Sequence, residues 1–224
     1  MSRPSRGTIS AAAAALARRY GRPRRARRRP LLDVLVETVL SQNTNDRNSH
    51  RAYLALRRRF PRWDLVMDAP VRAVAAPIAS GGLANIKAVR IKALLSEFAR
   101  RFGRPTLEPL RRLPAEDAYR YLLSLAGVGP KTAACTLLFG QGTPIFPVDT
   151  HIARISQRLG WARPGETPAA FQERFRRLVP DRLVLSLHLN LIAHGRAVCH
   201  PGRPACPACP IQRHCTWHHS KERS

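Results

Sequence analysis

The stretch LAGVGPKTAACTLLFG, from Leu125 to Gly140, places two glycines and a proline directly before a lysine and an apolar run. A helical pattern over residues 115–123 precedes it, so the order helix, tight turn, helix is predicted. Pro130 suits the first position of the second helix, because the N–H it lacks has no partner there in any case. We expect Gly127 and Gly129 to supply a positive φ or a close approach that a side chain would prevent.

The turn also predicts an anion-binding site. The unpaired N–H groups at the start of a helix, together with the positive end of its dipole, bind phosphate readily. An ordinary packing corner between two helices is the alternative, and the turn alone does not separate the two.

Lys131 falls in the first turn of the second helix. The chain has 39 lysines and arginines, and only four of them are lysines. A phosphate contact would be served as well by arginine, whose guanidinium stays protonated. A lysine amine, in contrast, can lose its proton and form a Schiff base. The choice of lysine therefore suggests a nucleophile, with phosphate binding as the alternative.

Asp149 follows in the segment FPVDTHIARI. Its position predicts the N-cap of a helix over residues 150–159. A carboxylate that faces the glycine turn could instead stabilise a cationic transition state or help to activate the lysine.

The composition indicates a polyanionic partner. The net charge is +25 and the isoelectric point about 11.7, which is typical of a protein that binds nucleic acid. Arginine drift on a solvated surface is the alternative. No apolar run approaches the roughly 20 residues of a membrane span, so we expect no membrane association and a cytoplasmic, nucleoid-associated location.

Apolar residues recur at helical spacing along the chain, and no strand-type alternation lasts long enough to build a sheet. The sequence therefore predicts an all-α fold. An N-terminal helix over 9–20 precedes an arginine- and proline-rich stretch at 22–30, with an organellar transit peptide as the alternative for this region. The other expected helices cover residues 31–40, 51–60, 86–102, 115–123, 131–139, 150–159, 168–178 and 184–193.

Four of the five cysteines fall in the frame C-x6-C-x2-C-x5-C: Cys199, Cys206, Cys209 and Cys215. Four thiols so close in sequence suit one tetrahedral site, in a segment too poor in apolar residues to pack without a staple. A [4Fe–4S] cluster is favoured over a structural zinc ion, because zinc ribbons usually show two C-x2-C pairs. Disulfides fit a cytosolic DNA-binding chain poorly. The fifth cysteine, Cys135, is expected in the core.

Together these motifs resemble endonuclease III, a DNA glycosylase of the helix-hairpin-helix superfamily that carries a [4Fe–4S] cluster. The resemblance runs from about Ile9 to Cys215. It implies a six-helix barrel domain over 30–143, which contains the hairpin, and a discontinuous iron–sulfur domain formed by 1–29 and 144–224. It rests on LSQNTND (40–46), GLANIKA (82–88), LAGVGPKTA (125–133), PVDTHIARI (147–155), LIAHGRAVC (191–199) and the four-cysteine frame.

The resemblance implies a bifunctional DNA glycosylase and abasic-site lyase of base excision repair. It would act as a monomer on double-stranded DNA that carries a damaged base, most often an oxidised pyrimidine, or an abasic site. Lys131 would attack C1′ of the flipped nucleotide with help from Asp149, and β-elimination would cleave the strand. The residues expected to contact DNA are the wedge residues Gln42, Asn43 and Leu83, the hairpin residues Gly127, Val128, Gly129 and Thr132, and Arg203 beside the cluster.

Two other functions fit part of the pattern. Glu37 lies near the position of the catalytic acid in the related adenine glycosylases, which suggests a monofunctional glycosylase for a mispaired or modified base. Those enzymes generally lack the hairpin lysine, so we expect Glu37 to be a surface or supporting carboxylate. A DNA-binding protein that has lost catalysis is the other alternative. Ala126 and Pro130 also depart from the commonest family pattern, which bears on hairpin detail and substrate range.

Overall fold

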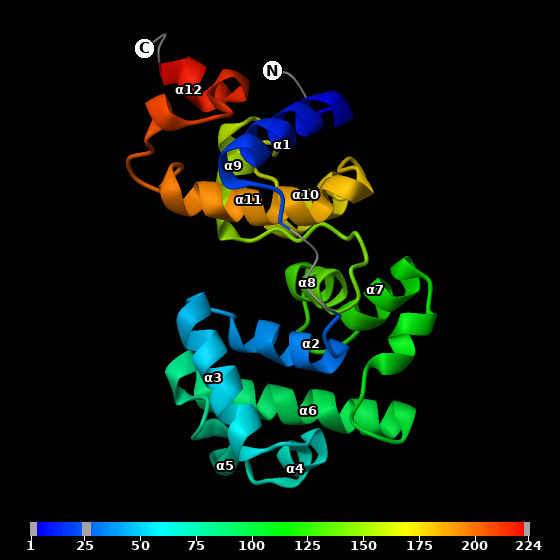
Figure 1. Cartoon of the computed structure of the whole chain (residues 1–224). Coiled ribbons are helices and arrows are strands. Elements are labelled where there is room, and N and C mark those ends of the chain that lie inside the picture. Colours follow the sequence, from blue (N-terminus) through cyan, green and yellow to red (C-terminus); the bar gives the residue numbers. More distant parts are fainter. Residues whose placement is uncertain (1–3, 24–27, 222–224) are drawn as a thin grey trace. The chain divides into compact units, whose positions relative to one another are not determined.

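The structure is a computed structural model, and it describes residues 4–23 and 28–221 of the chain (Figure 1). Within these residues every element is a helix and none is a strand, so the predicted all-α fold class is confirmed. Residues 24–27, part of the predicted arginine- and proline-rich stretch, lie outside the described residues. None of the helices described is long and apolar enough to cross a membrane.

The chain divides into two compact units. Residues 27–143 form the central unit from one continuous piece of chain. Residues 1–26 and 144–224, from the two ends of the chain, form the terminal unit. The assignment of a six-helix barrel to the first unit and of an iron–sulfur cluster to the second stays a prediction.

The described part of the central unit is organised around one apolar helix, α2. Seven of the ten residues of α2 are buried, and the helix packs against α8, α3 and α6. Its sequence LLDVLVETVL is apolar on almost every side, which is typical of a helix surrounded by others. The elements of this unit are α2 (Leu31–Leu40), α3 (Asp46–Arg59), α4 (Trp63–Asp68), α5 (Val71–Ala75), η1 (Ala79–Gly81), α6 (Ala84–Phe102), η2 (Glu108–Arg112), α7 (Ala115–Leu123) and α8 (Pro130–Gly140).

The short helices α4 and α5 are absent from the sequence-based prediction, which places no helix between residues 60 and 86. With 6 and 5 residues they are too short to show a helical repeat or to be stable alone. The ammonium group of Lys92 on α6 donates hydrogen bonds to the carbonyl groups of Val66, Met67 and Ala69. These carbonyls lie at the end of α4, where a helix leaves them without partners, so α4 depends on a tertiary contact.

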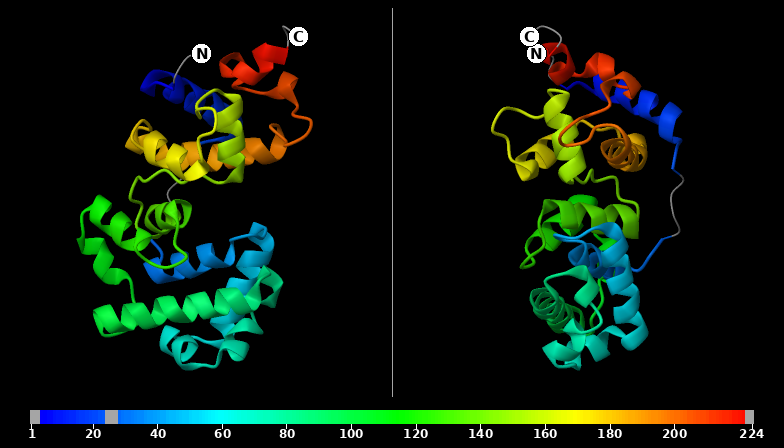
Figure 2. Two further views of the ribbon diagram at one scale, coloured as in Figure 1. Left: turned by 180° about the vertical axis from the view of Figure 1, so that it is seen from behind. Right: turned by 90° about the vertical axis from the view of Figure 1, so that its left-hand side faces the viewer.

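The terminal unit joins segments that are far apart in sequence. Helix α1 packs against α11 (Figure 2). The Oη of Tyr20 lies 3.1 Å from Nδ1 of His194, and Nδ2 of Asn190 donates a hydrogen bond of 3.0 Å to the carbonyl of Gly21. The elements of this unit are α1 (Arg6–Tyr20), α9 (Thr150–Arg158), α10 (Pro168–Phe175), η3 (Asp181–Leu183), α11 (Val184–Ala197), η4 (Cys206–Ala208), η5 (Gln212–His214) and α12 (Thr216–Lys221).

A buried aromatic cluster lies in the core of the terminal unit. The ring of Phe175 lies 5.3 Å from that of Phe146, 5.3 Å from that of Trp161 and 4.8 Å from that of Phe171, measured between centroids. Aromatic pairs at these separations add to the free energy gained from burial alone. The cluster anchors α10 beside the segment that leads into α9.

One ion pair fastens the loop between α9 and α10. Arg174 donates hydrogen bonds of 2.8 and 2.7 Å to the two carboxylate oxygens of Glu166, and a third of 2.8 Å to the carbonyl of Trp161. The Glu166 side chain is only 9% exposed, and its bond from Arg174 holds its pKa below the ordinary value. Paired charges with this geometry stabilise more than exposed ones.

Candidate nucleic-acid interface and metal centre

The predicted hairpin lies between α7 and α8, and its first glycine has the expected geometry. Gly127 has a φ of 78°, in the left-handed region that favours glycine. A Cβ at this position would lie 2.3 Å from Nε of Arg90, which belongs to α6. Gly127 therefore meets both expectations, a positive φ and a close approach.

Gly129 does not have the positive φ that was one of the two expectations for it. Its φ of −88° and ψ of 177° are extended backbone that any residue adopts. A Cβ built there would meet no atom within 4 Å. The space above Gly129 is therefore open, and a group from outside the chain can approach its backbone.

The hairpin leaves backbone donors free at the start of α8. Gly129 is the N-cap and makes no side-chain cap, and within the described residues no acceptor faces the N–H groups of Gly129, Lys131 and Thr132. The N–H of Val128, in contrast, donates to the carbonyl of Leu125 over 3.1 Å. The side chains of Val128 and Thr132 are buried, so the free donors that the described residues offer at the four predicted hairpin contacts are the backbone N–H groups of Gly127, Gly129 and Thr132.

Lys131 differs from Lys87 and Lys92 in its hydrogen bonding. Lys87 and Lys92 both donate hydrogen bonds to backbone carbonyls of the central unit. Lys131 is half-buried in the first turn of α8, and among the described residues of its unit it has no hydrogen-bond or ion-pair partner. Its amine is therefore not committed to a structural contact within that unit.

The predicted wedge residues lie in two segments, 41–43 and 82–83, and each segment contains an unusual backbone conformation. Asn43 has a φ of 54° and Leu83 a φ of 51°, and no other non-glycine residue among those described has a positive φ. For a leucine this conformation is strained, and strain of this kind gathers at functional sites. Leu83 is also 52% exposed, which is unusual for a large apolar side chain. Asn43 is exposed as well.

Gln42 is fastened to the hairpin. Its Nε2 donates hydrogen bonds of 3.2 Å to Oγ1 of Thr132 and 3.4 Å to the carbonyl of Gly127. Its Oε1 accepts a hydrogen bond of 2.6 Å from Arg90. The structure therefore brings the first predicted wedge segment and the hairpin together within the central unit.

Asp149 belongs to the terminal unit and is the N-cap of α9, as predicted. Its Oδ1 accepts a hydrogen bond of 2.8 Å from the N–H of Ile152. The side chain is half-buried, and its second oxygen has no partner among the described residues. The capping function thus uses one carboxylate oxygen and leaves the other available. Because Lys131 lies in the central unit, a joint role of these two residues stays a prediction.

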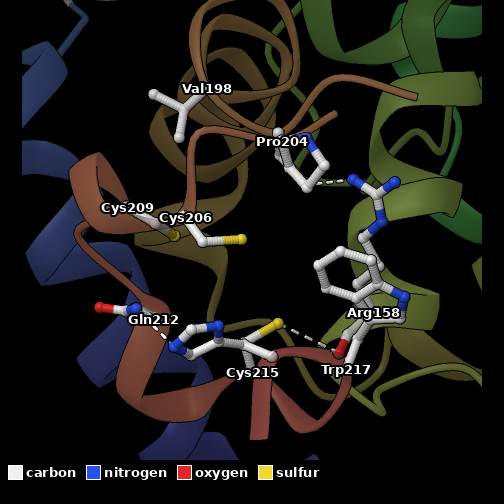
Figure 3. Close-up of a pocket in the computed structure, with 10 residues that line it drawn as sticks. Arg158, Val198, Pro204, Cys206, Cys209, Gln212, Cys215 and Trp217 are labelled. Carbon is white, nitrogen blue, oxygen red and sulfur yellow. Dashed lines mark hydrogen bonds between the residues drawn. The ribbon is translucent and has the colours of Figure 1, made fainter. Parts of the chain in front are cut away.

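The four cysteines of the predicted metal frame line one pocket of the terminal unit. The pocket holds about 290 Å³ of empty space, part of it open to solvent, and Arg158, Trp217 and His218 also line it. Figure 3 shows the sulfur atoms of Cys206 and Cys215 turned into this pocket. Within the described residues, however, no group of three or more His, Cys, Asp or Glu side chains is arranged to hold a metal ion.

The chemistry of this pocket suits thiolate ligands that are balanced by positive charge. Burial, with smaller contributions from the neighbouring cysteines, raises the pKa of the Cys209 thiol to about 11. The Nη1 of Arg158 donates a hydrogen bond of 3.1 Å to Sγ of Cys199. Buried thiolates are unfavourable without such compensation, so the donor set fits a bound metal or cluster. Arg203 lies exposed in the loop between Cys199 and Cys206.

Both carboxylate oxygens of Glu37 have a partner in the central unit. Its Oε2 accepts a hydrogen bond of 2.6 Å from Arg29, and its Oε1 lies 2.7 Å from Nδ1 of His50. Both carboxylate oxygens are therefore engaged within the central unit. This agrees with a supporting carboxylate and not with a free catalytic acid.

Sequence reasoning did not identify two residues of α6. Lys87 donates to the carbonyls of the residues that precede the two wedge segments, and Arg90 contacts Gln42 and the hairpin. A signal for Lys87 is nevertheless present in the sequence. Lys87 occupies the same helical register as the buried residues Ile91, Leu94 and Phe98, so a charged side chain interrupts an apolar stripe. A charge in that register is unfavourable unless it is used.

An all-α chain with a glycine hairpin, two strained wedge segments and four pocket-lining cysteines has the architecture of a helix-hairpin-helix DNA glycosylase. Endonuclease III bound non-covalently to DNA has this fold, with a TM-score of 0.82 at 23% identity over 99% of this chain and 100% of that one. A thermostable thymine-DNA glycosylase has it too, with a TM-score of 0.78 at 20% identity over 96% of this chain and 97% of the other. At these identities the likeness shows the fold.

The chain belongs to the HhH-GPD superfamily of base excision DNA repair proteins, whose family model matches residues 36–181. It is 33% identical to endonuclease III of Thermotoga maritima over 185 residues, which cover 83% of this chain and 82% of that protein. It is 40% identical over 166 residues to the Arabidopsis thaliana protein named "Putative DNA glycosylase At3g47830", covering 74% of this chain and 57% of that protein. The predicted endonuclease III family and glycosylase class are confirmed.

Proposed function

We propose that this chain removes a damaged base from double-stranded DNA and then cleaves the resulting abasic site, with Lys131 as the nucleophile. The observation that carries the proposal is the state of Lys131. It lies in the first turn of α8 without a partner in its unit, whereas Lys87 and Lys92 are bound to carbonyls. Arginine could bind phosphate at that position but could not act as a nucleophile.

The reaction begins when the neutral amine of Lys131 attacks C1′ of the damaged nucleotide. The N-glycosidic bond breaks, and the base leaves with the bonding electron pair and takes up a proton. The sugar ring opens to give a Schiff base between Nζ and C1′. Loss of a C2′ proton then expels the 3′ phosphate, and water releases the lysine from the product.

Asp149 supports this reaction as a carboxylate. One of its oxygens caps α9, which fixes the side chain, and the other has no partner among the described residues. A fixed negative charge stabilises the positive charge that develops on the sugar as the base departs.

The hairpin and the wedge segments bind and open the duplex. The free N–H groups at the start of α8 are suited to a backbone phosphate, and the open space at Gly129 lets the phosphate approach. Exposed Leu83 and Asn43 fill the gap left in the stack when a nucleotide is rotated out. The net charge of +25 supplies non-specific attraction to DNA.

The resident cofactor proposed is a [4Fe–4S] cluster held by Cys199, Cys206, Cys209 and Cys215. Four thiols around one pocket, with Arg158 beside Cys199, are a donor set suited to it. Bound there, it would cross-link and stabilise the segment from 199 to 215. No step of the proposed reaction uses it. Iron and acid-labile sulfide assays test this assignment, and stoichiometric zinc in a colourless protein would contradict it.

Borohydride trapping tests the function. Wild-type protein mixed with duplex DNA that contains an abasic site should form a covalent complex after reduction of the Schiff base. Lys131→Gln should form none. Lys131→Arg is the matched control, because it keeps the charge for phosphate binding and should bind DNA without cross-linking. Strand cleavage by a wild-type protein that is never trapped would rule out Lys131 as the nucleophile.

The substrate class proposed is oxidised pyrimidines, on the basis of the endonuclease III family. A panel of duplexes, each with one defined lesion, should be scored separately for base release and for strand cleavage. Glu37→Gln provides a further control, since the contacts of Glu37 with Arg29 and His50 argue for a structural role. Loss of base release in Glu37→Gln, with trapping by Lys131 absent, would favour the monofunctional alternative.

A further inference from the structure

We infer that Lys87 is a positioning residue that holds the two wedge segments, 41–43 and 82–83, in one fixed arrangement for entry into the DNA stack. The inference rests on the proposed opening of duplex DNA by these segments. In this role Lys87 contacts neither DNA nor the reacting atoms. It acts through the backbone carbonyls of Leu40 and Gly81, which it holds.

The contacts of Lys87 join the two places where the wedge segments begin. Its Nζ donates a hydrogen bond of 2.7 Å to the carbonyl of Leu40 and one of 2.7 Å to the carbonyl of Gly81. Leu40 is the last residue of α2 and directly precedes 41–43, and Gly81 directly precedes 82–83. One ammonium group therefore bridges the two segments.

The burial of Lys87 indicates that the fold depends on this bridge and that it is not an incidental surface contact. The residue is only 2% exposed and lies on the apolar face of α6, in register with Ile91. Burial and the nearby charge of Arg90 lower its pKa. A charge on an apolar face is unfavourable unless hydrogen bonds compensate it, and the two carbonyls provide them.

The bridge lies beside the two strained residues. Asn43 and Leu83 have positive φ values. Each lies within three residues after a carbonyl group that accepts a hydrogen bond from Lys87. Strained conformations persist only where the surroundings fix them. Close packing contributes as well, since a Cβ at Gly81 would lie 3.3 Å from Cβ of Ala52. Lys87 thus adds a polar contact that supports both segments.

Arg90, one turn further along α6, extends the arrangement to the hairpin. It donates a hydrogen bond to Gln42 and packs against Gly127. Lys87 and Arg90 therefore link both wedge segments and the hairpin through a single helix. A rigid helix fixes the geometry of a site more accurately than its loops would alone.

A support of this kind acts on the opening of the duplex and not on the attack at C1′. Wedge segments held in advance lose little conformational freedom when they enter the stack. Without Lys87 they would have to be ordered during opening, so its loss should matter most for a well-stacked, paired lesion. A lesion that is already unpaired needs less opening, so its removal should depend little on Lys87.

Lys87→Met tests the inference under single-turnover conditions, with one lesion placed either in a paired duplex or in an unpaired bubble. We expect a loss on the order of 30-fold in the rate for the paired duplex and less than about threefold for the bubble. Lys92→Met is the matched control, because Lys92 also holds carbonyls but lies away from both segments. It should change the two rates equally. An equal loss on both substrates in Lys87→Met would overturn the inference.

A binding measurement separates this inference from the proposed reaction. A 2-aminopurine beside a non-cleavable abasic analogue reports the opening of the stack by its fluorescence, without any chemistry. Wild type should raise the fluorescence, whether or not Lys131 proves to be the nucleophile, and Lys87→Met should bind with a smaller rise. An equal rise in the two proteins overturns the inference. If Lys87→Met does not fold, as judged by circular dichroism, Lys87→Gln keeps a donor group and takes its place.

Discussion

The guanidinium of Arg90 occupies the space that a side chain at Gly127 would need, because a Cβ there would lie 2.3 Å from its Nε. Gly127 also has a φ of 78°. The two glycines of this short turn therefore differ. The backbone and surroundings of Gly127 require a glycine, whereas those of Gly129 would accept a side chain. The difference gives a matched pair of substitutions.

Gly127→Ala should destabilise the protein by about 1–3 kcal/mol, through the left-handed backbone and the displacement of Arg90. Gly129→Ala should cost less than about 1 kcal/mol, since the backbone is extended and the space open. If phosphate approaches at Gly129, DNA binding should nevertheless weaken in Gly129→Ala. Thermal denaturation and a DNA titration measure the two effects, and equal stability of the variants would contradict the first expectation.

Asp149 offers a way to separate capping from catalysis. Asp149→Asn keeps a side-chain oxygen for the N–H of Ile152, so the free energy of unfolding should stay within about 0.5 kcal/mol of wild type. Base release should fall by at least about 100-fold, because the fixed negative charge is lost. Asp149→Ala should lose stability as well, by about 1 kcal/mol. Unchanged turnover in Asp149→Asn would leave the residue with the capping role alone.

Non-specific DNA binding should depend steeply on salt. The chain has 39 basic residues against 14 acidic ones, and each phosphate contact that they make releases counterions. Affinity for undamaged duplex should fall roughly 10³-fold between about 50 and 200 mM salt. Arg203→Gln should lower the logarithmic slope by about one unit if this exposed arginine contacts a phosphate. A flat dependence would place the arginines outside the DNA footprint.

The Glu166–Arg174 pair predicts a dependence of stability on pH. The folded pKa of Glu166 lies below its unfolded value, mainly through the hydrogen bond from Arg174. The pair therefore contributes stability that is fully present above the unfolded pKa of about 4.3 and is lost as pH falls through the folded pKa. Glu166→Gln should cost about 2 kcal/mol at pH 7 and progressively less as the pH falls below about 4.

Glu97→Gln is the control for this pair. Glu97 also pairs with an arginine, Arg100, but the side chains are 33% and 74% exposed. An exposed i,i+3 pair on a helix contributes about 0.2–0.5 kcal/mol, so Glu97→Gln should change stability little both at pH 7 and at low pH. Denaturant unfolding curves at several pH values measure both variants against wild type.

The long helices could be predicted from the sequence because their apolar residues repeat regularly. The predicted helix over 31–40 coincides with α2, and the one over 115–123 with α7. The short helices α4 and α5 could not be predicted, since α4 depends on the contact from Lys92. That contact joins residues more than twenty positions apart, and local spacing carries no information about it.

In the site, too, features set by the local sequence could be predicted and features set by tertiary contacts could not. Capping by Asp149 is a local property and was predictable, and the gathering of the four cysteines followed from their spacing. The φ of Gly129 was not predictable, because glycine adopts both signs of φ at similar cost. The link from Arg90 to Gln42 joins residues 48 positions apart and needed the structure. Lys87 is an intermediate case. Its position within an apolar stripe of α6 can be recognised in the sequence, but its hydrogen-bond partners cannot.

The division of the chain into a continuous and a discontinuous unit has a consequence for its synthesis on the ribosome. The central unit, residues 27–143, is complete as soon as its single segment has emerged, so it can fold while translation continues. The terminal unit must wait, because α1 packs against α11, which is made only after the whole central unit. Until then α1 lacks its partner. The four cysteines between residues 199 and 215 emerge later still, so the proposed cluster can be bound only after the central unit and α11 have been made.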